Sequence, residues 1–467
     1  MRAGALPRRG DRMQPRVVDA IDAAVAAALD AGADDVEVSY ERVDLSFARF
    51  ARSRFTQVGA AATTWLRVRA LAGGRLGARL SGTLDRDAVV AAARGAVAAA
   101  RAAPPAVPGF AFAAGGGATL ADVPPPRPPA VPEPWAAAAA PAAVAAGFDA
   151  ARRLGCDSAG AVKIVQRERA VQTTAGCARA GADGWIDLQW IASDGDASGY
   201  AGRLASLGEP IDVEAVARDA AERAARGRGA ERVDPRAMDV VLAPAAVAEL
   251  IEWMAMASFG ARAVLDGHSL LCDRRGKPVC DARVTIEDRP VPGELAFDAE
   301  GCARVRVAAI EAGVAGDPVT DLTTAARLGD PRGSTGHAPD IDDEHAAGPA
   351  ARHVHLSAGE ATEADLIGRV DDGLYVTRLH YVNGLLDPPR AVTTGMTRDG
   401  TFRIRGGRLA GGVRNLRFTD SVLDALGPRL GAVGRDAVRV PAWWSRHAFV
   451  TAPALLVRAF QFTGTSR

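Results

Sequence analysis

The sequence contains few aromatic residues and no excess of charge of either sign. Aromatic side chains make up 5% of the 467 residues, and 56 Lys and Arg balance 56 Asp and Glu. A chain without net charge has no bulk attraction for a polyanion. We therefore expect no nucleic-acid partner. Hydrophobic residues make up 48% of the chain, which is enough to form a sizeable core.

Cysteines are few, odd in number and widely spaced. No two of the five form a C-x-x-C pair, and this pattern argues against a disulfide framework and suits a reducing compartment. Residues 1–12 are basic but no apolar stretch follows, so they are not a secretory signal. They form either a disordered extension or a stretch ahead of a start at Met13. Alanine-rich runs are broken too early to span a bilayer, so we expect a cytoplasmic protein without membrane association.

Local motifs of several enzyme classes are also missing. The sequence has no P-loop, no G-x-S-x-G elbow and no H-E-x-x-H helix. Histidines do cluster modestly: His353 and His355 lie two apart on an expected strand, and His380 lies on another. Two strand histidines and a third could hold zinc with an open position, which makes an independent metallohydrolase one alternative. Further histidines precede them in a polar loop, at His337 and His345, and surface or interface roles on a β-sheet are the alternative for these histidines.

Hydrophobic periodicity predicts an α+β fold. Residues 14–104 read as helix, antiparallel meander and helix, and residues 105–134 as a Pro- and Gly-rich linker or loop. A central α+β unit is expected at 135–232, either as a domain of its own or as the completion of the first. The N-terminal part is thus expected to have two layers, of antiparallel strands and of helices. A β-rich C-terminal domain is expected at 236–467, with further helices at 361–370 and 420–426.

The stretch DVVLAPAAVAELIEWMAMASF, residues 239–259, reads as a strand leading into a helix. Pro244 occupies a favourable first helical position because it needs no amide donor there. The helix carries no histidine or cysteine, although a strand leading into a helix often supports an active site. Its buried stripe is expected to comprise Val247, Leu250, Ile251, Met254 and Ser258.

Two polar blocks follow late in the chain, in GMTRDGTFRI and VRNLRF. Asp399 and Gly400 form a favourable turn dipeptide next to Arg398, while Arg414 and Asn415 are polar positions on or near a strand. These residues either line a cleft or form a satisfied structural network.

The same region resembles the TldD/PmbA family, the so-called gyrase modulators. The segment GLYVTRLHYVNGLLDPPRAVTTGMTRDGTFRIRGGRLAGGVRNLRFTDS is similar to the family's closing region. GADDVEVSYERVDLSFARF and WLRVRALAGGRLGARLSG resemble its first domain, and VVLAPAAVAELI resembles the start of its last domain. The resemblance spans roughly residues 17–440. It implies an α+β N-terminal part, a β-rich C-terminal domain and a link to proteolysis or peptide maturation.

The resemblance also implies what this chain lacks. TldD-type members resemble zinc peptidases with an H-E-x-x-x-H helix and a distant cysteine ligand. Matched without gaps, the two histidine positions fall on Glu252 and Ala257 and the glutamate position on Trp253, and no cysteine follows Cys302. These four absences place the chain with the metal-free, PmbA (TldE)-like members.

Members of that kind partner a catalytic, zinc-bearing homologue, and the pair trims unfolded peptides. We therefore expect either such a heteromer or a homodimer, with a peptide held by strand addition to a sheet edge of the C-terminal domain. A peptide-binding scaffold without protease activity is the third alternative. The family's older link to gyrase finds no support in the neutral charge of this chain.

Overall fold

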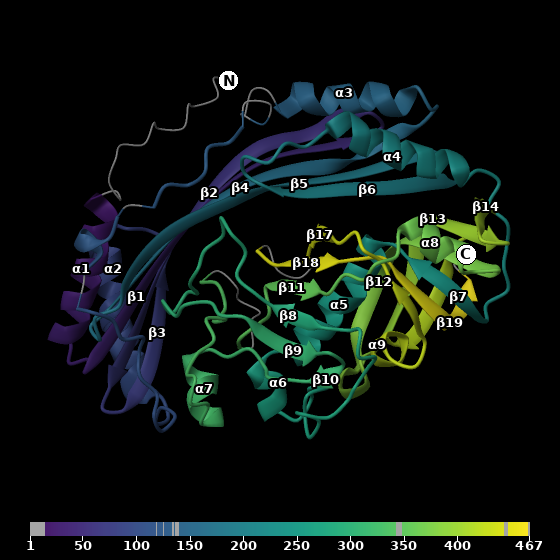
Figure 1. Cartoon of the computed structure of the whole chain (residues 1–467). Helices are drawn as coiled ribbons and strands as arrows, with labels where there is room; N and C mark the ends of the chain where they lie inside the picture. The colour runs from purple at the N-terminus through teal and green to yellow at the C-terminus, as the bar shows by residue number, and fades with distance from the viewer. Residues whose placement is uncertain are drawn as a thin grey trace.

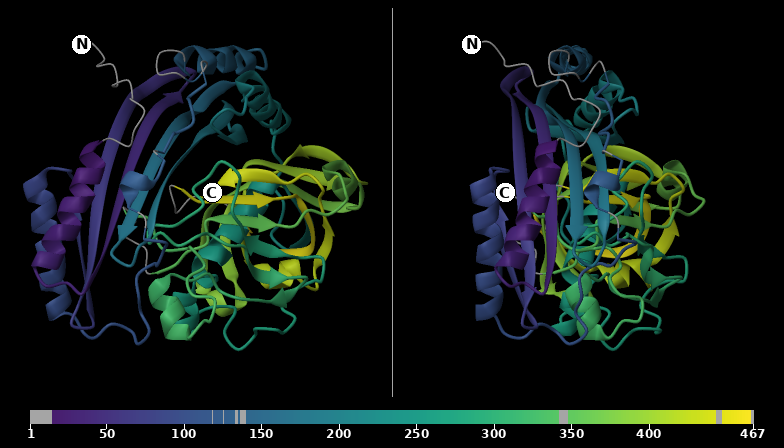
Figure 2. Two further views of the ribbon diagram at one scale, coloured as in Figure 1. Left: turned by 60° about the vertical axis from the view of Figure 1, so that its left-hand side comes forward. Right: turned by 90° about the vertical axis from the view of Figure 1, so that its left-hand side faces the viewer.

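The N-terminal sheet of the protein arches over a C-terminal domain (Figure 1; Figure 2). None of the helices in the described part of the chain combines the length and the apolar character that a membrane crossing requires. The five cysteines are free. The computed structural model describes residues 15–117, 119–124, 126–132, 135, 140–341, 348–442 and 447–465. The basic stretch 1–12 and His345 lie outside these residues.

Six antiparallel strands form the arch, in the order β3-β2-β1-β4-β5-β6. The central pair, β1 and β4, joins the expected first unit to the expected central unit, so the two share one sheet. The strands are β1 (Asp35–Ala51), β2 (Arg54–Ala72), β3 (Arg75–Ser81), β4 (Asp157–Thr173), β5 (Ala178–Asp194) and β6 (Ala197–Ser206).

Four helices cover the outer face of the arch (Figure 1). The alternation of apolar and charged side chains along β1 explains why the helices cover this face. Val36, Val38 and Tyr40 pack with the apolar sides of the first two helices, whereas Glu37 and Glu41 point to the inner face. The four helices are α1 (Pro15–Asp30), α2 (Arg86–Ala102), α3 (Ala140–Arg152) and α4 (Val213–Arg226).

Buried ion pairs fasten one half of the inner face to loops of the C-terminal domain. Arg69 bonds Glu37 and Glu300, each at 2.6 Å, and Arg169 bonds Glu41 and Asp340. Because breaking one partner of such a pair leaves an uncompensated buried charge, this half of the interface is costly to open. The other half of the inner face borders the candidate site.

The C-terminal domain contains two mixed sheets. One has the order β10-β9-β8-β11-β18-β17, and the other has the path β12-β7-β19-β15-β13-β14 with β16 beside β19. The first sheet comprises β8 (Ile286–Asp288), β9 (Val307–Glu311), β10 (Val314–Ala315), β11 (His353–Leu356), β17 (Val438–Pro441) and β18 (Phe449–Ala452). The second comprises β7 (Ala237–Leu242), β12 (Asp372–Asp387), β13 (Val392–Arg405), β14 (Arg408–Gly412), β15 (Leu416–Ser421), β16 (Leu430–Val433) and β19 (Leu455–Thr465).

Helix α5 (Pro244–Ser258) lies between these sheets and contributes to the largest core cluster. The expected helices at 361–370 and 420–426 are present as α8 (Glu363–Gly368) and α9 (Val422–Leu426). Sequence periodicity missed α6 (Ala261–Leu265) and α7 (Leu322–Leu328), because neither is long enough to show a repeating stripe. Single 3₁₀ turns occur at η1 (Leu120–Asp122) and η3 (Pro388–Arg390).

Candidate functional site in the cleft beneath the arch

A cavity of about 710 Å³ lies between the open half of the arch and helix α5. We call it the cleft cavity. Strands β17 and β18 form its third side. The cavity therefore lies where the arch, helix α5 and a sheet of the C-terminal domain meet. Its walls are formed by Val43, Leu45, Ala61, Thr63, Lys163, Val165, Trp185, Asp187, Gln189, Tyr200, Ala245, Ala248, Glu249, Glu252, Arg378, Val440, Pro441, Ala442, His447, Phe449 and Val450.

Helix α5 presents a polar strip to this cavity. The helix follows β7 directly, with Pro244 in its first turn, as the sequence predicts. The predicted stripe of Val247, Leu250, Ile251, Met254 and Ser258 is buried. Glu249 and Glu252 are three residues apart, so they share the neighbouring face and line the cleft cavity together.

The three positions that match the family's zinc helix point in different directions. Glu252 lines the cleft cavity and is 8% exposed. Trp253 is buried against β12, where a side chain at Gly384 would approach within 2.8 Å of the Trp253 Cβ. Ala257 lies near the end of the helix and does not line the cavity. The position of the general base is thus used for packing.

The side chains lining the cleft cavity do not fit a zinc site. Glu249, Glu252 and His447 share the cavity, but their ligand atoms do not meet within 4.8 Å as a set of three. Among the described residues only Asp298, Glu300 and Cys302 do so. Asp298 already accepts backbone N–H groups of Glu300, Cys302 and Ala338, and Glu300 bonds Arg69. Burial raises the pKa of the Cys302 thiol, so this group reads as a structural turn.

Burial dominates the electrostatics of the cleft cavity. It raises the pKa of Glu249 to about 7, against the opposing charge of Arg378. It also raises the pKa of Asp187, although Lys163 Nζ lies 3.4 Å from that carboxylate. It lowers the pKa of His447 to about 3, so that the imidazole is neutral at physiological pH. The cavity therefore combines apolar walls with a neutral histidine and carboxylates that are costly to charge.

The three histidines of the alternative zinc site are not brought together. His353 and His355 lie on β11 in one sheet, whereas His380 lies on β12 in the other. His353 is buried, with its Nε2 3.2 Å from Glu294 Oε2 and its ring stacked on Phe449. Sequence spacing could place two histidines on one face, but it could not show that the third belongs to a different layer.

An open strand edge borders the cleft cavity. Strand β3 pairs with β2 only from Leu66 onward, so within the described residues the stretch 54–65 of β2 pairs with β1 alone. The part of this stretch from Phe55 to Trp65 carries no charge, and Ala61 and Thr63 line the cavity. Unprotected edges of this kind can accept another strand. The N-terminal sheet thus offers an edge for strand addition in addition to those expected in the C-terminal domain.

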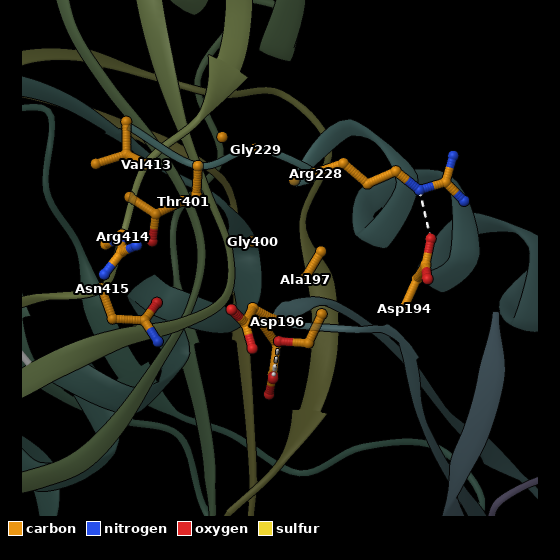
Figure 3. A pocket seen from close by; sticks show the side chains of 15 residues that line it. Asp194, Asp196, Ala197, Arg228, Gly229, Gly400, Thr401, Val413, Arg414 and Asn415 are labelled. Carbon is orange, nitrogen blue, oxygen red and sulfur yellow. Dashed lines mark hydrogen bonds and ion pairs between the residues drawn. The ribbon is translucent and has the colours of Figure 1, made fainter. Parts of the chain in front are cut away.

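Four of the five residues in the two polar blocks meet in a second cavity (Figure 3). Asp399, Gly400, Arg414 and Asn415 line it, whereas Arg398 does not. We call this space, of about 670 Å³, the junction cavity, because the β5–β6 turn and the segment after α4 complete it. Its full lining is Asp194, Asp196, Ala197, Ser198, Gly227, Arg228, Gly229, Ala230, Asp399, Gly400, Thr401, Gly412, Val413, Arg414 and Asn415.

Asp399 is also a structural residue, so both interpretations of the TRDG block hold in part. It is buried at a φ of 53° and accepts a hydrogen bond of 2.8 Å from Ser198 Oγ and one of 3.2 Å from Arg378 Nη1. Thr377 donates to the carbonyls of Asp399 and Gly400 and fixes the bend.

Sequence reasoning missed several residues of the cleft cavity. Glu249 had a local signal, because it lies at helical spacing from Glu252 beside a buried stripe. Lys163, Tyr200 and Arg378 had none, because they come from strands that meet only in the folded chain. The family resemblance did not supply them either.

Residues 235–464 match the family described as PmbA/TldA metallopeptidase C-terminal domain. A curated relative named "Metalloprotease" from Methanothermobacter thermautotrophicus is 27% identical over 234 residues. That match covers 49% of either chain, so this chain spans about half the length of the relative in the alignment.

Three solved structures share the fold. TldE from Thermococcus kodakarensis has a TM-score of 0.80 at 17% identity, covering 95% of this chain and 100% of its own. A proposed modulator of a DNA gyrase from Thermotoga maritima has a TM-score of 0.78 at 20% identity, and the match covers 95% of this chain and 99% of that one. A proposed modulator of DNA gyrase from Bacteroides thetaiotaomicron has a TM-score of 0.73 at 18% identity, and the match covers 96% of this chain and 98% of that one.

The α+β fold, with its arched sheet and strand-rich C-terminal domain, is that of a metallopeptidase-related protein. Residues 235–464, the C-terminal half of the chain, belong to the TldD/PmbA family.

Proposed function

We propose that the chain is the metal-free, peptide-holding subunit of a TldD/PmbA-type peptidase. In this proposal a zinc-bearing homologue with the H-E-x-x-x-H helix forms a dimer with it and carries out hydrolysis. The observation that carries the proposal is the face of α5 in the cleft cavity. It presents Glu249 and Glu252, and Trp253 is turned away into the core, so that neither a ligand set nor a general base is assembled.

The open edge of β2 supports a peptide as the ligand. An extended peptide can pair with residues 54–65 through main-chain hydrogen bonds, which are independent of sequence. Alternate side chains of that peptide then point into the cleft cavity beside Ala61 and Thr63. The apolar walls suit the side chains of an unfolded segment.

Pairing with a homologue is supported by the family's fold. The structure named TldE shares this fold over nearly the whole chain, and two copies of one fold can form a pseudo-symmetric dimer. We place the assembly in the cytoplasm, to which five free cysteines are suited.

Co-expression tests the proposal. The chain is purified alone and together with a homologue from the same genome that carries H-E-x-x-x-H, and zinc content and hydrolysis of an unfolded peptide are measured. We expect zinc and hydrolysis only when the homologue is present. Stoichiometric zinc in the chain alone, lost in a His355→Ala variant, would overturn the proposal. A homodimer that binds peptide but never pairs with the homologue would favour a peptide-binding scaffold.

A further inference from the structure

The junction cavity has no part in the proposed peptide cleft, yet it contains polar groups without partners in the part of the chain that the structure describes. Two of its three aspartates are already balanced. Asp194 lies 2.5 Å from Arg228 Nε, and Asp399 is held by Arg378 and Ser198. The groups that remain are those able to contact a ligand.

Thr401 is the most informative of these groups. It is 4% exposed, it lines the cavity, and its Oγ1 has no hydrogen-bond partner in the described part of the chain. A buried hydroxyl without a partner lowers stability, because it loses its bonds to water and gains nothing in return. Such a group at a cavity wall points to a bound molecule that completes its hydrogen bond.

Two further donors lie on the same wall. The side chains of Arg414 and Asn415 make no ion pair or hydrogen bond among the described residues, and Figure 3 shows both on the same side of the cavity as Thr401. Arg414 is exposed and Asn415 half-buried. A guanidinium, an amide and a hydroxyl together match a carboxylate, which accepts two parallel bonds from arginine.

One acceptor lies on the other side of the junction. Asp196 belongs to the tight β5–β6 turn of the arch, lines the cavity and has no partner among the described residues. A negative charge there repels a simple anion but accepts an N–H group.

Glycines hold the two walls at their present spacing. A side chain at Gly412 would approach the Gly227 carbonyl oxygen within 2.7 Å, and Gly400 has a φ of 127°. The cavity therefore depends on backbone positions that other residues adopt poorly.

We infer that the junction cavity binds the free C-terminal end of a peptide, with its carboxylate on Arg414, Asn415 and Thr401 and a backbone N–H on Asp196. A short peptide end supplies both an anion and N–H donors, whereas inorganic phosphate and acetate supply no N–H donor for Asp196. That the carboxylate belongs to a peptide rests on the proposed function. Recognition of the carboxylate itself does not.

Binding to the purified full chain tests this inference. N-acetyl-trialanine with a free C-terminus, its C-terminal amide, acetate and inorganic phosphate are titrated separately and followed by ligand-observed NMR. We expect the free acid to bind at least about tenfold more tightly than the amide, because a bond to a charged group is lost in the amide. Acetate and phosphate are expected to bind more weakly than the acid.

Three variants and a control identify the residues. Arg414→Gln is expected to weaken binding of the acid about tenfold and to abolish its advantage over the amide. Arg408→Gln, which removes an exposed arginine of β14 that does not line the cavity, leaves binding unchanged. Asp196→Asn reduces the preference for the peptide acid over acetate.

Thr401→Val separates a ligand group from a structural one. The isosteric change removes a hydroxyl that has no partner among the described residues, so thermal stability should be kept or raised while binding of the acid weakens. A structural hydroxyl would show the opposite, lower stability with unchanged binding.

Equal binding of acid and amide, or full binding by Arg414→Gln, would overturn the inference. Acetate as tight as the peptide acid would overturn the assignment to a peptide. All of these measurements use the chain alone, so they remain informative if pairing with a zinc-bearing homologue fails.

Discussion

Ser198 Oγ donates a hydrogen bond of 2.8 Å to Asp399 Oδ1, and this bond joins the arch to the C-terminal domain between the two cavities. Asp399 also accepts a bond from Arg378, whose guanidinium lies 4.4 Å from the centre of the Tyr200 ring in the cleft cavity. One buried carboxylate thus fixes a residue of each cavity.

Replacing Asp399 by asparagine should loosen this junction. Asparagine tolerates the positive φ of this position, so the change removes the charge without adding backbone strain. We expect a loss of about 1–3 kcal/mol in the free energy of unfolding, measured by chemical denaturation. Asp371→Asn, at an exposed position, serves as the control. An Asp399→Asn protein as stable as the control would show that the carboxylate does not hold the junction.

Glu249 predicts a pH dependence of stability. Its pKa is raised to about 7 by burial, above the ordinary value of 4.5, so the folded state binds the proton more tightly than the unfolded state. Its stabilising contribution is complete below pH 4.5 and is lost as the pH rises through 7. Glu249→Gln should therefore be more stable than the parent at pH 8, by on the order of 1–3 kcal/mol, and nearly equal to it at pH 5. Parallel denaturation curves at the two pH values measure this, and the exposed Glu360→Gln should show no such difference between them.

Charge on the open edge of β2 should block strand addition. Val58 is 57% exposed on the stretch that pairs with β1 alone, and lysine at such an edge opposes a further strand. Val58→Lys should weaken binding of a fluorescent unfolded peptide severalfold, while the free energy of unfolding changes by less than about 0.5 kcal/mol. Leu80→Lys is the matched control, since Leu80 is 49% exposed on β3, away from the cavity. Equal effects of the two changes would argue against the β2 edge.

The contact between Trp253 and Gly384 should be intolerant of added volume. A Cβ at Gly384 would lie 2.8 Å from the Trp253 Cβ, so Gly384→Ala must shift α5 against β12. We expect the free energy of unfolding, measured by thermal or chemical denaturation, to fall by about 1–3 kcal/mol. Gly411→Ala, where an added methyl group meets nothing within 4 Å, should cost less. If the two variants are equally stable, Trp253 is not packed as tightly as described.

Sequence reasoning recovered what is encoded locally. The α+β class and the stripe from Val247 to Ser258 follow from periodicity over a few turns, and the structure confirms both. The polar blocks around Asp399 and Arg414 were found as candidate cleft residues, and four of their five members do line a cavity.

The cavities themselves could not be predicted from local patterns. The cleft cavity forms where Lys163 of β4, Arg378 of β12 and Glu249 of α5 converge, and no spacing in the sequence relates these three. Thr401 is similar: it reads as an ordinary strand threonine until its burial and missing partner are known. The histidine alternative failed for the same reason, because membership of different sheets is a tertiary property.

The central ladder of the arch has a consequence for how the molecule folds. It pairs residues far apart in the chain, from Glu37 with Thr173 to Phe50 with Gly160. Closing such a long loop costs conformational entropy before the strands can pair. We therefore expect the arch to assemble slowly relative to the formation of its hairpins. Until β4 pairs with it, β1 has one edge without a partner strand, and residues 54–65 of β2 form a second such edge within the described residues. During that interval the first half of the arch is the part of the protein most exposed to aggregation.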